Sequence, residues 1–368
     1  MSSDVAQHSA DESALPSLTG LRYVAAVFVL AYHFLALTTG RAQSALLPVF
    51  GHGGAAVGLF FCLSGFVLAW RYQPTTHPRT FYRRRLARLG PTYLLSWIAA
   101  GIVLYLLHVS TPLSTGLLVL FVVQSWVPHY TVYWGWNGVA WSLCCEAFFY
   151  ALFPFVLRAL DRARTSTLYM VAFGLVCVVA VESVVAYWTT PLSGPLNANL
   201  GFVGWLLYIC PIGRLPEFLL GCVLGVAFRR DALPRVPTIF AIALTIVAYR
   251  ACFSVPHLAS QTGILVVPFV LLIVALAQSD RADRKVRVLG FRPFVALGDW
   301  SYAFYLFHAM LIEIAARHFA AFASPEVAVL WLTAAVVLTS IVAAFVNRVV
   351  ARPGRSVVLW SPRVSHAH

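Results

Sequence analysis

The chain alternates between long apolar runs and short polar stretches that are rich in arginine. An apolar run of about 20 residues is long enough to cross the hydrocarbon core of a bilayer as one α-helix. The sequence therefore predicts an all-α, polytopic transmembrane helical bundle of about ten spans, at residues 18–39, 54–72, 89–108, 139–158, 167–188, 214–228, 236–253, 261–278, 294–318 and 326–350.

Two further segments do not follow this pattern. Residues 113–127 are apolar but short, and counting them as a crossing would move the arginines of residues 158–164 to the other side of the membrane. We expect this piece to be re-entrant or interfacial on the external side. Residues 189–213 are rich in Gly, Pro and Asn and are expected to form an external segment.

Composition supports a membrane protein, because 60% of the residues are hydrophobic and only 11% are charged. Soluble domains carry about 25% charged residues. The net charge of +13 comes almost entirely from arginines that cluster between the spans, as in cytoplasmic loops, so we expect no nucleic-acid partner. This pattern predicts cytoplasmic N- and C-termini, with a polar tail at 1–17, a membrane domain at 18–350 and a basic tail at 351–368.

The first span carries two ionisable side chains, Arg22 at its entrance and His33 well inside. They are eleven positions apart, so they lie on one helical face about 16 Å apart along the axis. An ionisable group inside a membrane helix is costly and usually faces a protein interior or a wet cavity. His33 is therefore a candidate for chemistry, and a packing hydrogen bond to a neighbouring helix is the alternative.

Arg84 and Arg88 lie four residues apart, on one face of the third span where it begins. Two arginines on one face can hold a phosphate or a carboxylate. Anchoring to anionic membrane lipids is the alternative, and it accounts adequately for the neighbouring Arg83 and Arg85.

Other polar residues stand inside apolar spans, where each could serve packing or function. Glu146 needs a cationic or hydrogen-bonding partner, for which Arg22, His33 and His308 are candidates. The remaining positions are Ser64 in a Ser-Gly pair, Glu217 beside Arg214, and a stripe of Ser301, Tyr305 and His308. We find no CxxC, H-E-x-x-H, P-loop or G-x-S-x-G pattern, and we predict no metal site.

Taken together, these pieces resemble the acyltransferase-3 family of multipass membrane O-acyltransferases. Five stretches are similar to family motifs in order: LTGLRYVAAVFVLAYH to LDGLRGIAALLVVLYH, GLFFCLSGFVLAW to GVDLFFVLSGFL, FYRRRLARLGPTYLL to RRxxRIxPxY, WSLCCEAFFYALFP to WSLxxExxFYLLxP, and LGDWSYAFYLFH to LGxxSYxxYLxH. The chain departs from the pattern at Thr19, where the family has Asp, and at Ala147, where it has a second carboxylate. The form of the motifs is similar to a subgroup with exopolysaccharide acetyltransferases and macrolide acyltransferases.

The resemblance implies transfer of an acyl group, often acetyl, from acyl-CoA as co-substrate to a hydroxyl, with no bound cofactor. It implies that His33 is essential, that Arg22 supports it, and that Arg84 and Arg88 serve the donor. We add Glu146 to the catalytic group, Ser64 to the donor site, and Tyr305, His308 and Glu217 as supporting residues. Glu146 or Tyr305 is expected to orient the imidazole of His33, which could act as a general base or carry the acyl group itself.

The expected acceptor is a sugar hydroxyl in a surface polysaccharide, an exopolysaccharide or a lipid-linked precursor. The aromatic residues within 113–138 and the segment 189–213 are expected to face that sugar. The expected location is the bacterial cytoplasmic membrane. Acylation of a secondary metabolite such as a macrolide is an alternative. A transporter whose intramembrane Arg, His and Glu line a solute path is the alternative from another class.

Overall fold

A computed structural model describes residues 15–73, 77–189, 201–283, 286 and 288–351. Most of both predicted tails, 1–17 and 351–368, lies outside the described residues, as do residues 190–200 of the predicted external segment 189–213. The described part is almost entirely helical and contains no strand. Within it, nine helices are long and apolar enough to cross a membrane, and Thr238–Ser254 is a shorter apolar helix at the position of the remaining predicted span. The predicted polytopic helical bundle is confirmed.

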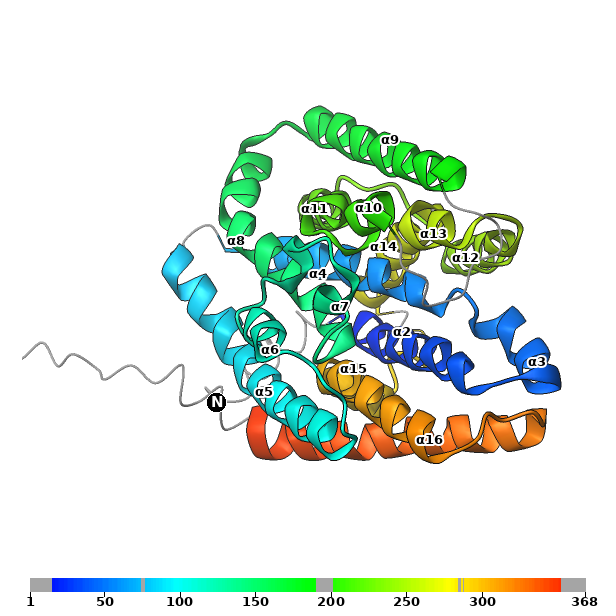
Figure 1. The fold of residues 1–368 in the computed structure, drawn as a ribbon. Coiled ribbons are helices and arrows are strands. Elements are labelled where there is room, and N and C mark those ends of the chain that lie inside the picture. Colours follow the sequence, from blue (N-terminus) through cyan, green and yellow to red (C-terminus); the bar gives the residue numbers. More distant parts are fainter. Residues whose placement is uncertain (1–14, 74–76, 190–200, 284–285, 287, 352–368) are drawn as a thin grey trace, which may run out of the picture.

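The centre of the bundle is α2 (Pro16–Phe34), which lies against α15 (Arg292–His318), as Figure 1 shows. Its other neighbours are α4 (Ala56–Trp70) and α14 (Val266–Arg281), and α11 (Pro211–Arg229) packs closely on α4. The outer helices are α5 (Pro78–Leu106), α8 (Trp141–Arg162), α9 (Thr165–Thr189), α12 (Thr238–Ala251) and α16 (Pro325–Val346). The first predicted span is thus enclosed by other helices.

Glycines bring α4 and α11 into close contact. A Cβ atom on Gly65 would lie 2.1 Å from the carbonyl oxygen of Phe218, and one on Gly221 would lie 2.1 Å from that of Cys62. Small residues let membrane helices approach each other at the backbone. The Ser-Gly pair at 64–65 therefore serves packing through its glycine, while Ser64 itself is only partly buried.

The structure differs from the predicted spans at three places. Helix α3 (Gly40–Phe50) lies between the first two predicted spans, where no span is predicted. Helix α5 begins at Pro78, eleven residues before the predicted third span, so the arginines of this stretch are part of the helix. Residues 201–209, expected in an external segment, are helical: α10 (Gly201–Gly204) is followed by a π-helical turn, Trp205–Ile209. Hydropathy failed here because a helix can continue through polar or small residues when neighbouring helices support it.

The apolar piece at 113–127 contains α6 (Leu113–Leu120), a helix of eight residues. Such a helix is only about 12 Å long and cannot cross a bilayer. The short helix α7 (Tyr130–Tyr133) and irregular backbone follow it and lead to α8. This agrees with the prediction that the segment makes no full crossing.

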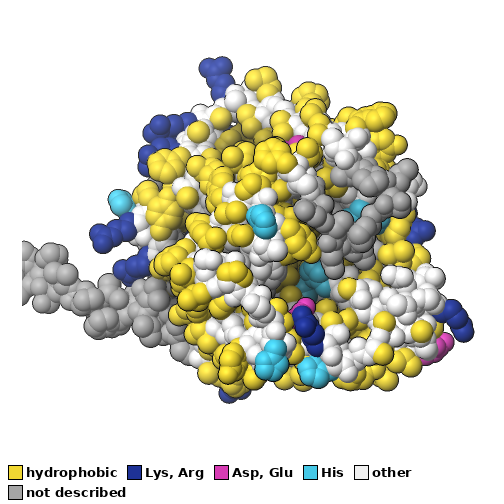
Figure 2. Space-filling view, in the orientation of Figure 1, with side chains coloured by type: hydrophobic (Ala, Val, Ile, Leu, Met, Phe, Trp, Pro, Cys, Tyr) yellow, Lys and Arg dark blue, Asp and Glu magenta, His cyan; other side chains and the backbone are white. Residues whose placement is uncertain are grey.

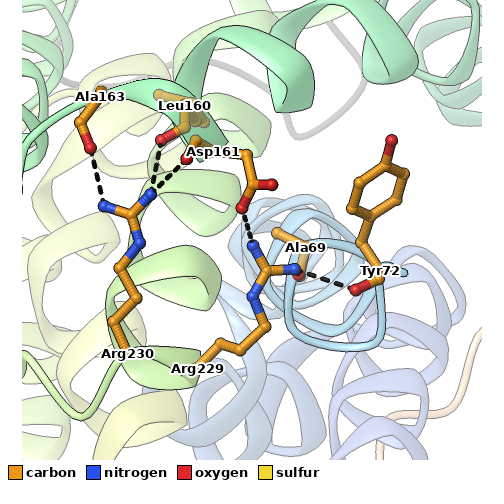
Figure 3. Close-up of polar contacts among 7 residues, drawn as sticks. All are labelled: Ala69, Tyr72, Leu160, Asp161, Ala163, Arg229 and Arg230. Atoms are coloured by element: carbon orange, nitrogen blue, oxygen red, sulfur yellow. Dashed lines mark hydrogen bonds and ion pairs between the residues drawn. The ribbon is translucent and has the colours of Figure 1, made fainter. Parts of the chain in front are cut away.

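Arginines gather at one end of the bundle, where α5 begins and α8 and α11 end (Figure 2). Figure 3 shows that Arg229 donates to the carbonyl oxygens of Ala69, at 3.1 Å, and Tyr72, at 3.0 Å, and pairs with the carboxylate of Asp161. Arg230 donates to three carbonyl oxygens at the end of α8, those of Leu160, Asp161 and Ala163. The last carbonyls of a helix lack partners within it, so these two arginines tie together the ends of α4, α8 and α11.

Candidate active site

His33 of α2 and His308 of α15 form a hydrogen-bonded pair inside the bundle. Nδ1 of His33 lies 2.9 Å from Nε2 of His308, and Nδ1 of His308 lies 2.6 Å from the carbonyl oxygen of Tyr305. A carbonyl oxygen only accepts, so Nδ1 of His308 carries the hydrogen. In the neutral rings, Nε2 of His308 then accepts from Nδ1 of His33, which leaves the lone pair of His33 on its own Nε2.

His33 lines a cavity of about 520 Å³, which we call the histidine cavity. Its wall is a mixture of aliphatic residues with several aromatic rings and two amides, and it includes Asn137, Trp141, Tyr208 and Gln261. Figure 2 shows a hollow in this face, near α2, α7 and α15, with histidine side chains visible in it. His308 is fully buried behind His33 and does not line the cavity.

A second cavity, of about 370 Å³, lies on the same bundle and is named the arginine cavity. It is lined by four arginines (Arg22, Arg71, Arg85 and Arg88) and only two carboxylates (Glu146 and Asp299). This excess of positive charge favours an anionic ligand, and guanidinium groups suit phosphate oxygens in particular.

Ser64 and Glu146 meet through a tyrosine on the wall of the arginine cavity. The hydroxyl of Tyr150 donates to Oε2 of Glu146 at 3.0 Å, and Ser64 Oγ lies 3.1 Å from the same hydroxyl. Because the single hydroxyl hydrogen of Tyr150 is used by Glu146, Ser64 donates to Tyr150. Glu146 also interacts electrostatically with Arg22, Arg85 and Arg88. Of the partners expected for Glu146, Arg22 is therefore close, whereas the two histidines bind each other.

A small space of about 50 Å³, the connecting cavity, lies between the other two. It shares Arg22 and Glu146 with the arginine cavity, and it shares Val57 and Tyr305 with the histidine cavity. Ser301, which is 1% exposed, also lines it, and its hydroxyl has no hydrogen-bond partner among the described residues. The three cavities thus form a series from the arginines to His33.

Tyr305 supports the pair of histidines through its backbone. Its carbonyl oxygen receives the hydrogen of His308, while its hydroxyl lies 2.9 Å from Ser142 Oγ and 3.1 Å from the carbonyl oxygen of Val139. The sequence suggested that Glu146 or Tyr305 orients the imidazole of His33. In the structure, the side chain that hydrogen-bonds to His33 is that of His308.

The predicted arginine pair is only partly brought together. Arg88 lines the arginine cavity, but Arg84 is exposed and does not. Arg85, which sequence reasoning assigned to lipid anchoring, lines the cavity with Arg88. Residues three apart also share a helical face, so spacing alone gave no means to choose between Arg84 and Arg85.

Glu217 lies away from all three cavities. Its Oε2 lies 3.1 Å from Nη2 of Arg214, and the two side chains are only 2% and 1% exposed. A glycine faces them, since a Cβ on Gly58 would lie 2.9 Å from Oε1 of Glu217. Among the described residues, no group of three or more His, Cys, Asp or Glu is arranged to hold a metal ion.

The sequence comparisons decide the family. A family model described as an acyltransferase domain, that of the acyltransferase-3 family, matches residues 15–348. The chain belongs to the acyltransferase-3 family. It is an enzyme that transfers acyl groups and a multi-pass membrane protein. The enzyme class is therefore favoured over the transporter that the intramembrane charges alone left open.

This acyltransferase-3 chain is similar to several named proteins over most of its length. It is 36% identical over 320 residues to acyltransferase MdmB of Streptomyces mycarofaciens, covering 82% of this chain and 80% of the relative. It is 26% identical to peptidoglycan O-acetyltransferase OatA of Listeria monocytogenes, covering 82% of this chain but 50% of the relative. It is 26% identical to exopolysaccharide production protein ExoZ of Rhizobium meliloti, covering 72% and 78%. No solved structure matches the chain.

Proposed function

We propose that this enzyme moves an acyl group, with acetyl as the first candidate, from acyl-CoA to a sugar hydroxyl, in a surface polysaccharide, an exopolysaccharide or a lipid-linked precursor. The observation that carries the proposal is the series of cavities that begins at four arginines and ends at His33. A donor with an anionic head and a long thin arm suits this shape, because its charges and its reactive group are far apart.

The donor end is the arginine cavity. Arg85 and Arg88 would hold the phosphates of coenzyme A, since they line the cavity from one face of α5. The arm would pass Arg22 and Glu146 and reach the connecting cavity, which these two residues also line. Arg84 stays a predicted donor residue, and its exposure makes the lipid-anchor alternative the simpler one for it.

The acceptor end is the histidine cavity. Trp141 and Tyr208 offer flat aromatic faces, and Asn137 and Gln261 offer amides that can exchange hydrogen bonds with hydroxyls. Apolar faces with a few placed polar groups suit a sugar ring. Two of the named relatives are described by glycan terms, peptidoglycan and exopolysaccharide, which supports a glycan acceptor. A hydroxyl of a secondary metabolite such as a macrolide is the second candidate acceptor.

In the chemical step, Nε2 of His33 takes the proton of the acceptor hydroxyl while the oxygen attacks the thioester carbonyl carbon. The carbon–sulfur bond then breaks, and the thiolate of coenzyme A leaves and takes up the proton. General base catalysis of this kind contributes about 10²–10⁴-fold. If the acyl group first joins Nε2, a carbon–nitrogen bond forms as the carbon–sulfur bond breaks and the thiolate leaves. In a second step the acceptor oxygen forms the ester bond, the carbon–nitrogen bond breaks, and the hydroxyl proton passes to the released imidazole. Acid quench and mass spectrometry of the His33 peptide separate these routes.

The test uses the full chain purified in detergent with radiolabelled acetyl-CoA. Octyl β-glucoside serves as a sugar acceptor and the glycosylated macrolide tylosin as a metabolite acceptor. We expect labelled ester on octyl β-glucoside and its absence with His33→Ala, while that variant keeps the elution profile of the wild type. Label on tylosin alone would support the second candidate, and transfer by His33→Ala at the wild-type rate would refute the role of His33.

We also propose a location in the bacterial cytoplasmic membrane with both chain ends in the cytoplasm. The arginine-rich end of the bundle supports this orientation, because basic residues accumulate on the cytoplasmic side. Fusion of alkaline phosphatase or green fluorescent protein to the C-terminus tests it. Fluorescence without phosphatase activity is expected, and the reverse result would place that terminus outside.

A further inference from the structure

Two π-helical turns supply side chains to the histidine cavity. Tyr208 lies in the turn Trp205–Ile209, and Gln261 lies in the turn Ser260–Ile264. A π-helical turn holds one more residue than an α-helical turn and is frequent at functional sites. The extra residue changes the direction in which the following side chains point, so each turn needs support from its surroundings.

Arg214 contacts both turns from behind the cavity. Its Nη1 donates to the backbone carbonyl oxygen of Gln261 at 3.2 Å, and its guanidinium carbon lies 5.2 Å from the ring centre of Tyr208. It also lies 5.5 Å from the ring centre of Phe61. Arg214 itself does not line any of the three cavities. One side chain thus links two segments that are about 50 residues apart in the chain.

Glu217 keeps this arginine in place and neutralises it. The carboxylate lies one helical turn along α11 at 3.1 Å from Nη2, and Gly58 leaves the space that the pair occupies. Replacement of a buried ion pair by apolar residues of similar size is often neutral or stabilising. Stability by itself therefore gives no reason for two fully buried charges at this position.

We propose that Arg214, held by Glu217, is a positioning residue that sets Tyr208 and Gln261 on the wall of the histidine cavity and so determines how the acceptor binds. The proposal rests on the proposed function, in which that cavity takes the acceptor. Arg214 itself lines neither the arginine cavity nor the connecting cavity, and it approaches the connecting cavity only through the ring face of Phe61. We therefore expect the donor half of the reaction to change little when Arg214 is replaced.

The decisive variant is the double substitution Arg214→Met/Glu217→Leu, which removes both charges and keeps the apolar volume. A single loss would leave one charge buried without its partner and could prevent folding. Arg214→Lys is the conservative variant, because lysine keeps the charge but lacks the planar group that reaches both turns. Arg229→Lys is the matched control, since it makes the same change at the other end of α11 and lines none of the cavities.

With acetyl-CoA and octyl β-glucoside, we expect the double variant and Arg214→Lys to raise the KM for the glucoside about tenfold or more. In these two variants, the KM for acetyl-CoA and the slow rate of CoA release without acceptor should stay at wild-type values. In the control Arg229→Lys, all of these kinetic constants should equal those of the wild type. An unchanged KM for the glucoside, or a parallel loss in donor and acceptor constants, would refute the positioning role.

Hydrogen–deuterium exchange of the purified protein tests the same inference without any turnover. In the double variant, exchange should increase in peptides that contain Trp205–Ile209 and Ser260–Ile264 and stay constant in α15. Unchanged exchange in both turns would overturn the inference even if the wild type transfers acetyl groups. Conversely, faster exchange of both turns in the double variant, together with no transferase activity in the wild type, would refute the proposed function alone.

Discussion

Nδ1 of His33 lies 2.9 Å from Nε2 of His308, although the two residues are 275 positions apart in the chain. His308 is in turn fixed by the carbonyl oxygen of Tyr305. The direction of donation in these two hydrogen bonds determines which nitrogen of His33 remains basic, because each neutral imidazole has one donor and one acceptor. A fully buried histidine thus sets the tautomer of the one on the cavity.

His308→Ala should lower acyl transfer about 10- to 100-fold, since loss of the hydrogen-bond partner that orients a functional histidine costs roughly this much at metal sites. His308→Gln should retain more activity, because its amide can donate to the carbonyl of Tyr305 and accept from His33. Steady-state kinetics would check these two rates, and we expect the KM for the donor to be equal in both variants. Full activity of His308→Ala would show that the pair serves packing only.

Arg85→Ala and Arg88→Ala should each raise the KM for acetyl-CoA about tenfold or more, because a hydrogen bond between charged groups contributes about 1.5–3 kcal/mol. Both residues line the arginine cavity. Arg84→Ala is the matched control on the same helix, and we expect its donor KM to equal that of the wild type. A raised KM for Arg84→Ala and Arg88→Ala, with an unchanged KM for Arg85→Ala, would favour the pair first inferred from the sequence.

The connecting cavity is narrow, so a larger side chain on its wall should block it. Ser301→Leu adds two heavy atoms beside a space of about 50 Å³, so it should block the arm of the donor and abolish transfer. Ser301→Ala only removes a hydroxyl that has no partner in the described structure, so its rate of acyl transfer should stay within about threefold of that of the wild type. Binding of desacetyl coenzyme A to the Leu variant, measured by calorimetry, should persist. Normal turnover by Ser301→Leu would argue against a passage at this place.

Arg230→Ala should lower stability without a change in kinetic constants. The side chain donates to three carbonyl oxygens at the end of α8, so we expect a loss of about 2–3 kcal/mol and a melting temperature lower by several degrees. Arg158→Ala, on the exposed surface of α8, is the control and should melt like the wild type. The measurement is thermal unfolding in detergent followed by tryptophan fluorescence. Equal melting temperatures of both variants would contradict a stabilising role of Arg230 at the end of α8.

Some features of the site were accessible from local sequence. Arg22 and His33 are on one face of one helix, and the helical repeat places them there whatever surrounds the helix. The motifs that resemble the acyltransferase-3 family include Arg22, Ser64, Glu146 and His308, all of which lie on the cavities or in contact with a residue that does. The choice between Arg84 and Arg85 was not accessible, because it depends on how far α5 is rotated about its own axis.

The sequence by itself determined the membrane class, the position of most spans and the candidate residues for chemistry, since the length of an apolar run and the cost of a charge inside it are local properties. Tertiary structure decided the partnership of His33 with His308, the entry of Arg85 into the arginine cavity and the contact of Arg214 with both π-helical turns. These relations join segments far apart in the chain. They depend on how the helices pack against one another, which a hydropathy pattern does not specify.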